Sequence, residues 1–290
     1  MSKPEAEVEI SPALVGELVR TQHPDLARGP ITGPIAGWDN AVFRLGEELG
    51  VRLPRRAAAL DALQSEQRWL PSLQCRLPLP VPAPLRVGRP QSPYPWPWSI
   101  TPWIAGLTAD RSPPDRDQAG VFAAFLDALH TEPPPEAPRN PYRGVPLAQR
   151  HAAFLRGTNA LARRGRPLDA RLLRLWLDAL ERPLDVAATW IHGDLHPSNV
   201  LVANGRISGV IDWGDLAQGD RATDLAATWM LFAEGDSREA IMARYKSVSS
   251  DTWARARAWA LLLSVVVLEA EDPSLSDAAE STMQRLIEGP

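Results

Sequence analysis

The stretch that decides the fold is Trp190-Ile191-His192-Gly193-Asp194-Leu195-His196-Pro197-Ser198-Asn199-Val200-Leu201-Val202. It places Asp194 and Asn199 directly before an apolar run that is typical of a β-strand. Further along, Val210-Ile211-Asp212-Trp213-Gly214 puts a second aspartate at the end of another apolar run. Two short strands would bring these three polar side chains to one edge, where they could hold a hydroxyl group and metal-bound phosphates.

The spacing of these residues indicates phosphoryl transfer. His192, Asp194 and Asn199 follow the pattern H-x-D-x-x-x-x-N, which is the spacing of a kinase catalytic loop. Asp194 is the predicted base, which orients an acceptor hydroxyl and takes its proton. Asn199 offers a neutral oxygen and Asp212 an anionic one, and together they suit Mg²⁺. An isolated aspartate before a strand is usually a cap or turn residue, so the prediction depends on the joint pattern.

Other polar residues in this part of the chain are expected to support the loop. His192 lies beside an apolar run and is predicted to be a buried ring that hydrogen-bonds backbone. His196 could touch metal or phosphate, but a turn-stabilising role is favoured. Asp220 is well placed to cap the helix that follows it, and Asp224 is assigned a structural role as well.

The composition describes a globular protein of two parts. With 290 residues the chain exceeds the usual size of one compact core, which predicts two lobes. Its formal net charge of -4 argues against nucleic acid as a partner, because such proteins normally present a basic surface. Cys75 is the single cysteine, so an intramolecular disulfide and a cysteine metal cluster are both excluded.

No membrane partner is expected. The longest apolar stretch, residues 258–268, is interrupted by Ser264 and is too short to cross a bilayer. Residues 1–10 lack the basic region and the apolar run of a secretory signal. A cytoplasmic protein, monomeric or homodimeric, is the expectation.

Residues 1–105 are predicted to form a β-rich N-terminal lobe. Ser11 is the expected N-cap of a short helix, and residues 41–45 and 51–53 read as a β-hairpin. Apolar residues at helical spacing predict a helix over 56–73, which carries Glu66. Prolines crowd residues 77–102, where 81–87 and 98–103 are the best strand candidates.

Residues 106–290 are predicted to form a mainly helical lobe that contains the catalytic loop and the acceptor site. The turn-rich segment 106–116 marks the boundary, and the prolines of 133–146 predict a loop. Helices are expected over 121–130, 147–164, 170–180, 223–232, 251–269 and 276–287. The fold class is therefore α+β, with a small β-rich lobe followed by a larger helical lobe.

A family resemblance follows from these motifs. Residues 191–202, then Ile211-Asp212-Trp213-Gly214-Asp215, and Gly219-Asp220 with Asp224-Leu225-Ala226 resemble the signature of the aminoglycoside phosphotransferase family. That family is similar to protein kinases in fold. The resemblance implies an ATP or GTP site between the lobes, two Mg²⁺ ions and transfer of the terminal phosphate to a hydroxyl of a small molecule.

The resemblance also implies nucleotide-binding residues, with one departure. A lysine on the third strand normally holds phosphate oxygens and pairs with a glutamate on the next helix, but only Lys3 and Lys246 are lysines here. Arg52 stands at the matching place, and Glu66 is its expected partner. An arginine stays charged and can bind phosphate through two nitrogens. Arg55 or Arg56 could serve instead.

A glycine-rich phosphate loop of the G-x-G-x-x-G type is absent. Its nearest equivalent is Gly37-Trp38-Asp39-Asn40, whose backbone N–H groups could cover phosphates, although a plain tight turn would look the same. By resemblance, the hinge that reads the base lies at Thr101 to Ile104. Trp103 is expected either to flank the base or simply to pack between the lobes.

The acceptor is left open between several classes. An aminoglycoside is a polycation and should meet carboxylates, for which Asp215, Glu234, Glu269 and Asp272 are the candidates in the helical lobe. The 11 tryptophans and the apolar helix from Trp253 would equally suit a macrolide, or merely a core. A small metabolite is a further alternative. Because the lysine and the glycine motif are missing, a catalytically weak nucleotide-binding module is the alternative from another class.

Overall fold

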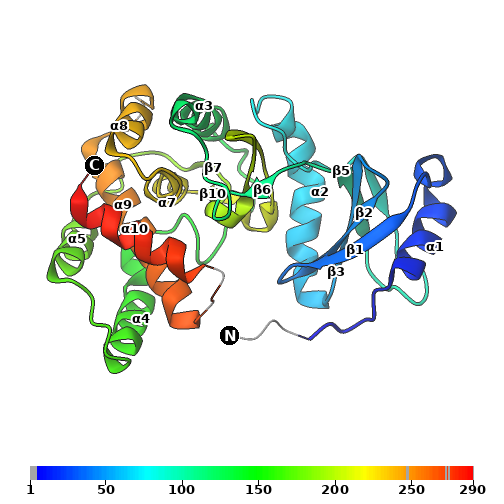
Figure 1. Ribbon diagram of the computed structural model, residues 1–290, viewed down its shortest axis with the longest axis horizontal. Coiled ribbons are helices and arrows are strands. Elements are labelled where there is room, and N and C mark those ends of the chain that lie inside the picture. Colours follow the sequence, from blue (N-terminus) through cyan, green and yellow to red (C-terminus); the bar gives the residue numbers. More distant parts are fainter. Residues whose placement is uncertain (1–4, 246–247, 272, 274, 290) are drawn as a thin grey trace. The chain divides into compact units, whose positions relative to one another are not determined.

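The computed structural model describes residues 5–245, 248–271, 273 and 275–289. Its backbone contacts divide the chain into two compact units. One unit contains Ser2–Arg76 and Pro80–Ala105, and the other contains Leu77–Leu79 and Gly106–Pro290. Figure 1 shows that the first unit carries a sheet with helices beside it and that the second unit is built mainly of helices. The expected α+β class is therefore confirmed.

The first unit is organised around an antiparallel sheet. Within the described residues this sheet has five strands in the order β1-β2-β3-β5-β4. Their bounds are β1 Ile31–Ala36, β2 Asn40–Leu45, β3 Leu49–Pro54, β4 Arg86–Gly88 and β5 Trp98–Pro102. The predicted hairpin is confirmed as β2 and β3, which pair from Asn40 opposite Pro54 to Leu45 opposite Leu49.

Alternation along the strands assigns one face of this sheet to the core. Side chains in a strand point to opposite faces in turn, so Phe43, Val51 and Ile100, which lie opposite one another, share a face. All three are fully buried. They pack with the apolar side of α1 (Pro12–Gln22), which begins at the predicted N-cap, where the Ser11 hydroxyl accepts a hydrogen bond from the Leu14 N–H.

The other face of the sheet carries polar residues and meets α2 (Leu60–Gln74). Arg52 of β3 lies opposite Ser99 of β5, and both are buried. The Gln67 side chain of α2 donates to the Ser99 hydroxyl at 2.9 Å. The predicted helix over 56–73 is thus present, with its first residues in a short 3-10 turn at Ala57–Ala59. The helix places Glu66 against this face of the sheet, beside Arg52 of β3.

The proline-rich segment forms less strand than the sequence indicates. Residues 81–87 were expected to be a strand, but only Arg86–Gly88 pairs with β5. Pro80, Pro82 and Pro84 lack the N–H that a ladder needs, which is why the chain before β4 stays irregular. The second candidate is confirmed as β5, and the tryptophans beside it, Trp96 and Trp98, are core residues.

The second unit contains two small antiparallel sheets. In one, β7 (Thr189–Ile191) pairs with β10 (Ala217–Gly219). In the other, β8 (Val200–Ala203) pairs with β6 (Leu107–Thr108) on one side and with β9 (Arg206–Val210) on the other. The two strands predicted around the catalytic segment are β8 and β9.

Helices make up the rest of this unit. Their bounds are α3 Ala119–Leu129, α4 His151–Arg163, α5 Ala170–Leu180, α6 Ala222–Leu225, α7 Ala227–Leu231, α8 Gly235–Arg244, α9 Ser250–Ala270 and α10 Ser276–Glu288. The long helix α9 is buried along most of its length and contacts α4, α5, α6 and α10 (Figure 1). No helix among the residues described has both the length and the apolar character needed to cross a membrane.

Two helices differ from the expectation. The helix predicted over 223–232 is divided into α6 and α7 at Ala226. Helix α8 was not expected, because its sequence GDSREAIMAR has only a few apolar residues and hence no clear stripe. Its buried positions include Ser237 and Arg238, and Arg238 donates to the carbonyls of Phe232 and Ala233. Tertiary contacts, rather than an apolar face, hold this helix.

Asp185 attaches the segment before β7 to α9. Its carboxylate accepts hydrogen bonds from the hydroxyls of Ser249 and Thr252 and from Arg255. The Ser249 hydroxyl is the main cause that lowers the pKa of Asp185 to about 2; burial opposes the shift, and Arg255 and Thr252 add to it.

We expect Asp185→Asn to reduce the stability at neutral pH by about 1 kcal/mol, as for a half-exposed ion pair. The lowered pKa means that the stabilisation is present above pH 3.8 and is lost as the pH falls toward 2. Urea unfolding of both proteins between pH 2 and 7 measures it, and their difference should shrink below pH 3.8. A constant difference across this range would contradict the assignment.

Candidate functional site

The predicted catalytic segment folds as a tight connection between β7 and β8. After Ile191 the chain turns at Gly193, whose φ is +85°. A Cβ atom there would lie 2.6 Å from the Asp215 carbonyl oxygen, so only glycine fits. Residues Pro197–Asn199 then form one turn of 3-10 helix that leads into β8. This backbone carries Asp194 and Asn199 on the same short loop.

Asp194 is held in place by charged and polar partners. Its Oδ1 accepts from Nη2 of Arg143 at 2.6 Å, and its Oδ2 lies 3.3 Å from Nε2 of His196. Burial raises the pKa of the Asp194 carboxyl, but the Arg143 and His196 charges outweigh burial and hold it well below its usual range. Burial likewise lowers the pKa of His196, and Asp194 outweighs that, so the pKa of His196 is raised. Asp194 is therefore an oriented carboxylate anion.

His192 and Asp224 hold the backbone of this loop. The His192 ring is fully buried, contacts the Ile211 carbonyl through Nε2 at 3.0 Å and accepts the Asp194 N–H through Nδ1 at 3.2 Å. The Asp224 carboxylate accepts from the N–H groups of His192 at 2.7 Å and Gly193 at 2.9 Å. The predicted position of His192 is thus observed, and Asp224 contributes more to the loop than the sequence suggested.

Strand pairing brings Asn199 and Asp212 to one end of the β8–β9 ladder. Val200 lies opposite Val210, and the Ile211 N–H donates to the Asn199 carbonyl at 2.9 Å. Asp212 follows directly, with a left-handed backbone at φ +60° and an exposed position. The edge that the sequence predicted for Asp194, Asn199 and Asp212 is formed.

The residues at this edge fit Mg²⁺. The Asn199 amide nitrogen donates to the Asp194 carbonyl at 2.9 Å, which turns the amide oxygen toward other ligands. In the part of the chain that is described, no three histidine, cysteine, aspartate or glutamate side chains form a metal site by themselves. An amide oxygen and a carboxylate, completed by phosphate oxygens and water, is a ligand set that Mg²⁺ accepts.

Arg143 and Asn140 are site residues that the sequence analysis missed. Both lie in the proline-rich loop 133–146, which was predicted only as a loop. The Asn140 side chain accepts the N–H groups of Tyr142 and Arg143 and donates to Asp215 at 2.7 Å. Arg143 reaches both Asp194 and, at 3.5 Å, Asp215. Asn-Pro is a turn signal in the sequence, but nothing local shows that this turn packs on the catalytic loop.

The predicted acceptor carboxylates do not gather at one place through the contacts observed. Asp215 is engaged by Asn140 and Arg143 beside the catalytic loop. Glu234, directly before α8, pairs with Arg116 at 3.3 Å, and Glu269 on α9 pairs with Arg156 at 4.0 Å. Asp272 lies outside the described residues. Each of the three described carboxylates therefore already has an arginine partner.

Asp220 joins the loop region to α9. The predicted cap is not formed by Asp220, because Arg221 occupies the N-cap position of α6 and makes no side-chain cap bond. The Asp220 Oδ1 accepts the Ala222 N–H at 3.1 Å, and its Oδ2 accepts from Nε of Arg255 at 2.8 Å. Both side chains are buried. His196 also has a turn role, since its Nδ1 accepts the Ser198 N–H at 3.2 Å.

In the first unit, Arg52 and Glu66 form the expected pair. Nη1 of Arg52 donates to Oε2 of Glu66 at 2.7 Å, and both side chains are buried. With the Asn40 amide oriented so that its oxygen faces Arg52, that oxygen accepts from Nη2 at 3.0 Å and from Nε at 3.2 Å. The guanidinium is thus fixed by a carboxylate and an amide.

The turn at residues 37–40 is tied down by the two other arginines. The Gly37 N–H donates to the Asn40 carbonyl at 2.8 Å. Arg55 donates to the Gly37 carbonyl at 3.2 Å, and Arg56 pairs with Asp39 at 2.5 Å. Both arginines therefore serve this turn, which leaves Arg52 as the stronger candidate for a phosphate-binding cation.

The predicted hinge follows β5. Thr101 is buried opposite Gly50, and the Trp103 N–H donates to the Glu48 carbonyl at 2.7 Å. The Arg44 guanidinium lies 5.3 Å from the centre of the Trp103 ring. Trp103 and Ile104 are both half-buried. The contacts described for Trp103 are packing contacts, and a role toward a base stays a prediction.

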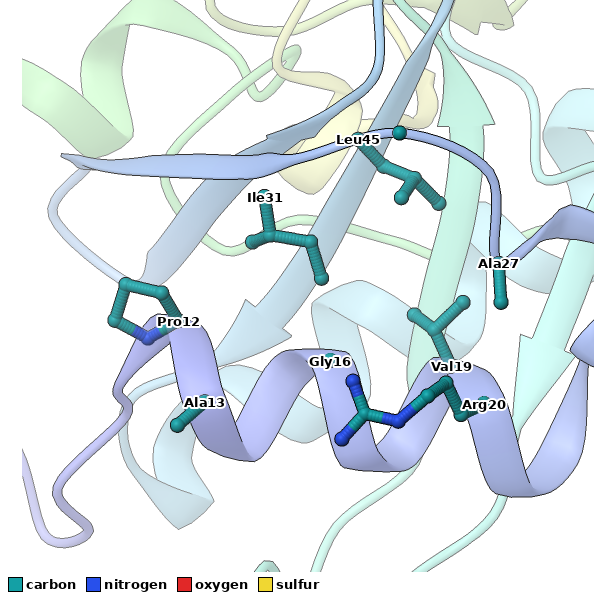
Figure 2. A pocket seen from close by; sticks show the side chains of 9 residues that line it. Pro12, Ala13, Gly16, Val19, Arg20, Ala27, Ile31 and Leu45 are labelled. Carbon is teal, nitrogen blue, oxygen red and sulfur yellow. The ribbon is translucent and has the colours of Figure 1, made fainter.

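A cavity of about 320 Å³ in the first unit lies away from these residues. Figure 2 shows it between α1 and the paired ends of β1 and β2, which carry Ile31 and Leu45. Its lining is mostly aliphatic and includes one arginine, Arg20. None of the predicted nucleotide-binding residues lines it, so it is no part of the candidate site.

A protein family and a curated protein are similar to this chain in sequence. The sequence profile of the phosphotransferase enzyme family (APH) matches residues 31–259. Among curated proteins, the uncharacterized protein YcbJ of Bacillus subtilis (strain 168) is 33% identical over 66 residues, which is 22% of this chain and 21% of YcbJ. The matched part thus spans about a fifth of that relative.

Solved structures match over almost the whole chain. The GDP complex of aminoglycoside 2'-phosphotransferase-IIIa superposes with a TM-score of 0.66 at 18% identity and covers 97% of this chain and 100% of that one. The macrolide 2'-phosphotransferase MphH of Brachybacterium faecium gives 0.57 at 22% identity, with 94% and 98% covered. The streptomycin-ATP complex of APH(2")-IIa gives 0.57 at 17%, with 95% and 99% covered. At these identities the likeness shows a shared fold.

Proposed function

The chain belongs to the phosphotransferase enzyme family, and from this membership we propose that it moves the terminal phosphate of ATP or GTP to a hydroxyl group of a small molecule. Its fold is the two-lobed, protein-kinase-like fold expected from the sequence, and it is a small-molecule kinase. The position of Asp194 supports the proposed reaction most directly. Its carboxylate is held by Arg143, and Asp194 lies on the same loop as Asn199.

Asp194 is proposed to act on the acceptor hydroxyl. Each carboxylate oxygen has more than one lone-pair direction, so an oxygen that faces Arg143 or His196 can still accept a further hydrogen bond. The acceptor oxygen forms its bond to the terminal phosphorus while the bond from phosphorus to the nucleoside diphosphate breaks. The hydroxyl proton passes to Asp194. A low pKa suits this role, because in a loose transition state the proton moves late and positioning dominates.

Asn199 and Asp212 are proposed to hold Mg²⁺, which when bound supplies positive charge that balances the phosphate oxygens. His192 and Asp224 keep the loop backbone in place, and so they position Asp194 without touching the substrate. Arg143 orients the Asp194 carboxylate and keeps it ionised.

Arg52 is proposed to bind phosphate oxygens of the nucleotide, with Glu66 and Asn40 orienting its guanidinium. We expect Arg52→Gln to weaken Mg-ATP binding about tenfold, because the charge is lost. Arg52→Lys keeps the charge beside Glu66 and should stay within about threefold of the unchanged protein. Calorimetric titration with Mg-ATP measures both. Arg55→Gln serves as the control, and a larger effect there would transfer the role to Arg55.

For the acceptor, the resemblance favours an aminoglycoside, and a macrolide is the second candidate. The first rests on the likeness to aminoglycoside phosphotransferases, one of which binds streptomycin. The second is favoured by three aliphatic side chains of α9 near Asp215, namely Leu262, Leu263 and Val266. Monomer or homodimer and a cytoplasmic location stay predictions.

One experiment tests the reaction. The purified chain is incubated with Mg-ATP or Mg-GTP and with an aminoglycoside, a macrolide or a hydroxylated small acid, and nucleoside diphosphate and phosphorylated acceptor are measured by mass spectrometry. Stoichiometric formation of both products with one acceptor supports the proposal. Nucleotide binding without product from any acceptor would favour the alternative of a nucleotide-binding module.

A further inference from the structure

A cavity of about 240 Å³ lies beside the catalytic loop, within the second unit. One wall is aliphatic and comes from α9, at Leu262, Leu263 and Val266. The polar part of the lining comes from Arg143, Arg150 and Asp215, and the exposed Tyr142 lines the cavity as well. Such a lining suits a molecule with one apolar side and one polar side.

The cavity is linked directly to the predicted base. Arg143 lines it and donates to Asp194 at 2.6 Å through Nη2. The Arg143 guanidinium therefore contacts Asp194 and also lines the cavity, so a molecule that fills the cavity lies close to Asp194. An acceptor bound here can present a hydroxyl to Asp194 while the rest of it contacts α9.

Arg150 differs from the other charged residues around the cavity, because it has no carboxylate partner among the described residues. Arg143 is matched by two carboxylates, Asp194 and Asp215, and Asp215 is further satisfied by Asn140. Arg150 has no carboxylate within 4.0 Å among the described residues. Its guanidinium lies 5.3 Å from the centre of the Tyr142 ring, and its buried Nε has no hydrogen-bond partner in the described structure.

Two further arginines, Arg143 and Arg156, lie near Arg150. Burial lowers the pKa of Arg150 first, and the neighbouring cations Arg143 and Arg156 lower it further. A half-buried guanidinium without a carboxylate is unfavourable unless an anion binds it.

We propose that this cavity binds the acceptor through a carboxylate that pairs with Arg150, with the aliphatic carbons of the acceptor against Leu262, Leu263 and Val266. This inference rests on the proposed function, since it names the chemical class of the acceptor: a hydroxylated, partly apolar carboxylic acid. It ranks such an acid above an aminoglycoside at Arg150, because a carboxylate can pair with this guanidinium and a cationic amine cannot.

The test compares two probes that differ only at C1, which is a carboxylate in one and an alcohol in the other. Binding of 3-hydroxyoctanoate and of 1,3-octanediol to the full chain is measured by calorimetry without nucleotide. The acid should bind about tenfold more tightly than the diol, as expected for a charge-assisted hydrogen bond, and added salt should reduce the difference. Arg150→Gln should remove this preference, whereas Arg150→Lys should keep most of it.

Arg163→Gln is the matched control, because Arg163 is an exposed arginine of α4 that does not line the cavity. It should leave the preference unchanged. Equal binding of acid and diol, binding of neither, or a preference that survives Arg150→Gln would overturn the inference. The proposed function and the carboxylate site at Arg150 can each be contradicted without the other. If the acid binds through Arg150 but no acceptor is phosphorylated, the proposed function is wrong. If an aminoglycoside is phosphorylated and the acid has no advantage, the carboxylate site is wrong.

Discussion

Asp194→Asn is expected to lower kcat about a thousandfold with the best acceptor, within the range that a positioned general base contributes. Asparagine has the same shape and keeps an oxygen toward Arg143, so the loop should fold as before. It cannot take a proton from the acceptor hydroxyl. The affinity for Mg-ATP should stay within about twofold, because Asp194 is assigned to the acceptor and not to the nucleotide. Steady-state kinetics and calorimetry measure the two quantities.

Asp178→Asn is a suitable control for this change. Asp178 is exposed on α5, and its replacement removes the same charge without touching the loop. Its kcat should be unchanged. If Asp194→Asn kept more than about a tenth of the activity, the carboxylate would not be the base, and the assignment drawn from the spacing of the loop would be wrong.

Asp224→Ala is expected to reduce the free energy of unfolding by about 3–5 kcal/mol, the usual cost of removing one partner from a buried charged network. Asp224 is fully buried and accepts from the N–H groups of His192 and Gly193, and it also contacts Nε2 of His130 at 3.2 Å. Alanine leaves these buried groups without an acceptor. Urea unfolding gives the change in midpoint, and the protein that remains folded should have a reduced kcat because the loop backbone is no longer held.

Asp127→Ala on α3 provides the comparison, since Asp127 is exposed and its loss should change the stability by less than about 0.5 kcal/mol. Asp224→Asn adds a second test. The amide keeps one acceptor oxygen for the loop but turns a donor toward the remaining N–H, so its loss of stability should lie between the two alanine variants. An unfolding midpoint equal to that of the unchanged protein would show that the loop does not depend on Asp224.

The local parts of both units were predictable because neighbouring residues determine them. The runs 41–45 and 51–53 on either side of the glycine-bounded segment 46–50 predicted the hairpin, and Ser11 before Pro12 predicted the start of α1. Helix α8 was not predictable, because its buried polar contacts leave no apolar period in the sequence. The apolar residues of 81–87 suggested a full strand, but the prolines there lack the N–H groups that strand pairing needs, so only the short β4 formed.

The sequence by itself determined which residues share the loop that carries the proposed base. His192, Asp194 and Asn199 lie within eight residues and are joined by hydrogen bonds inside the loop, so local spacing is enough to predict that they lie together. The tertiary structure alone decided what surrounds that loop. Arg143 is 51 residues before Asp194, and Arg150 is further from α9. Contacts over such separations depend on how loop 133–146 packs on β10 and on the loop that carries Asp194. Packing of this kind leaves no periodic signal in the residues that take part.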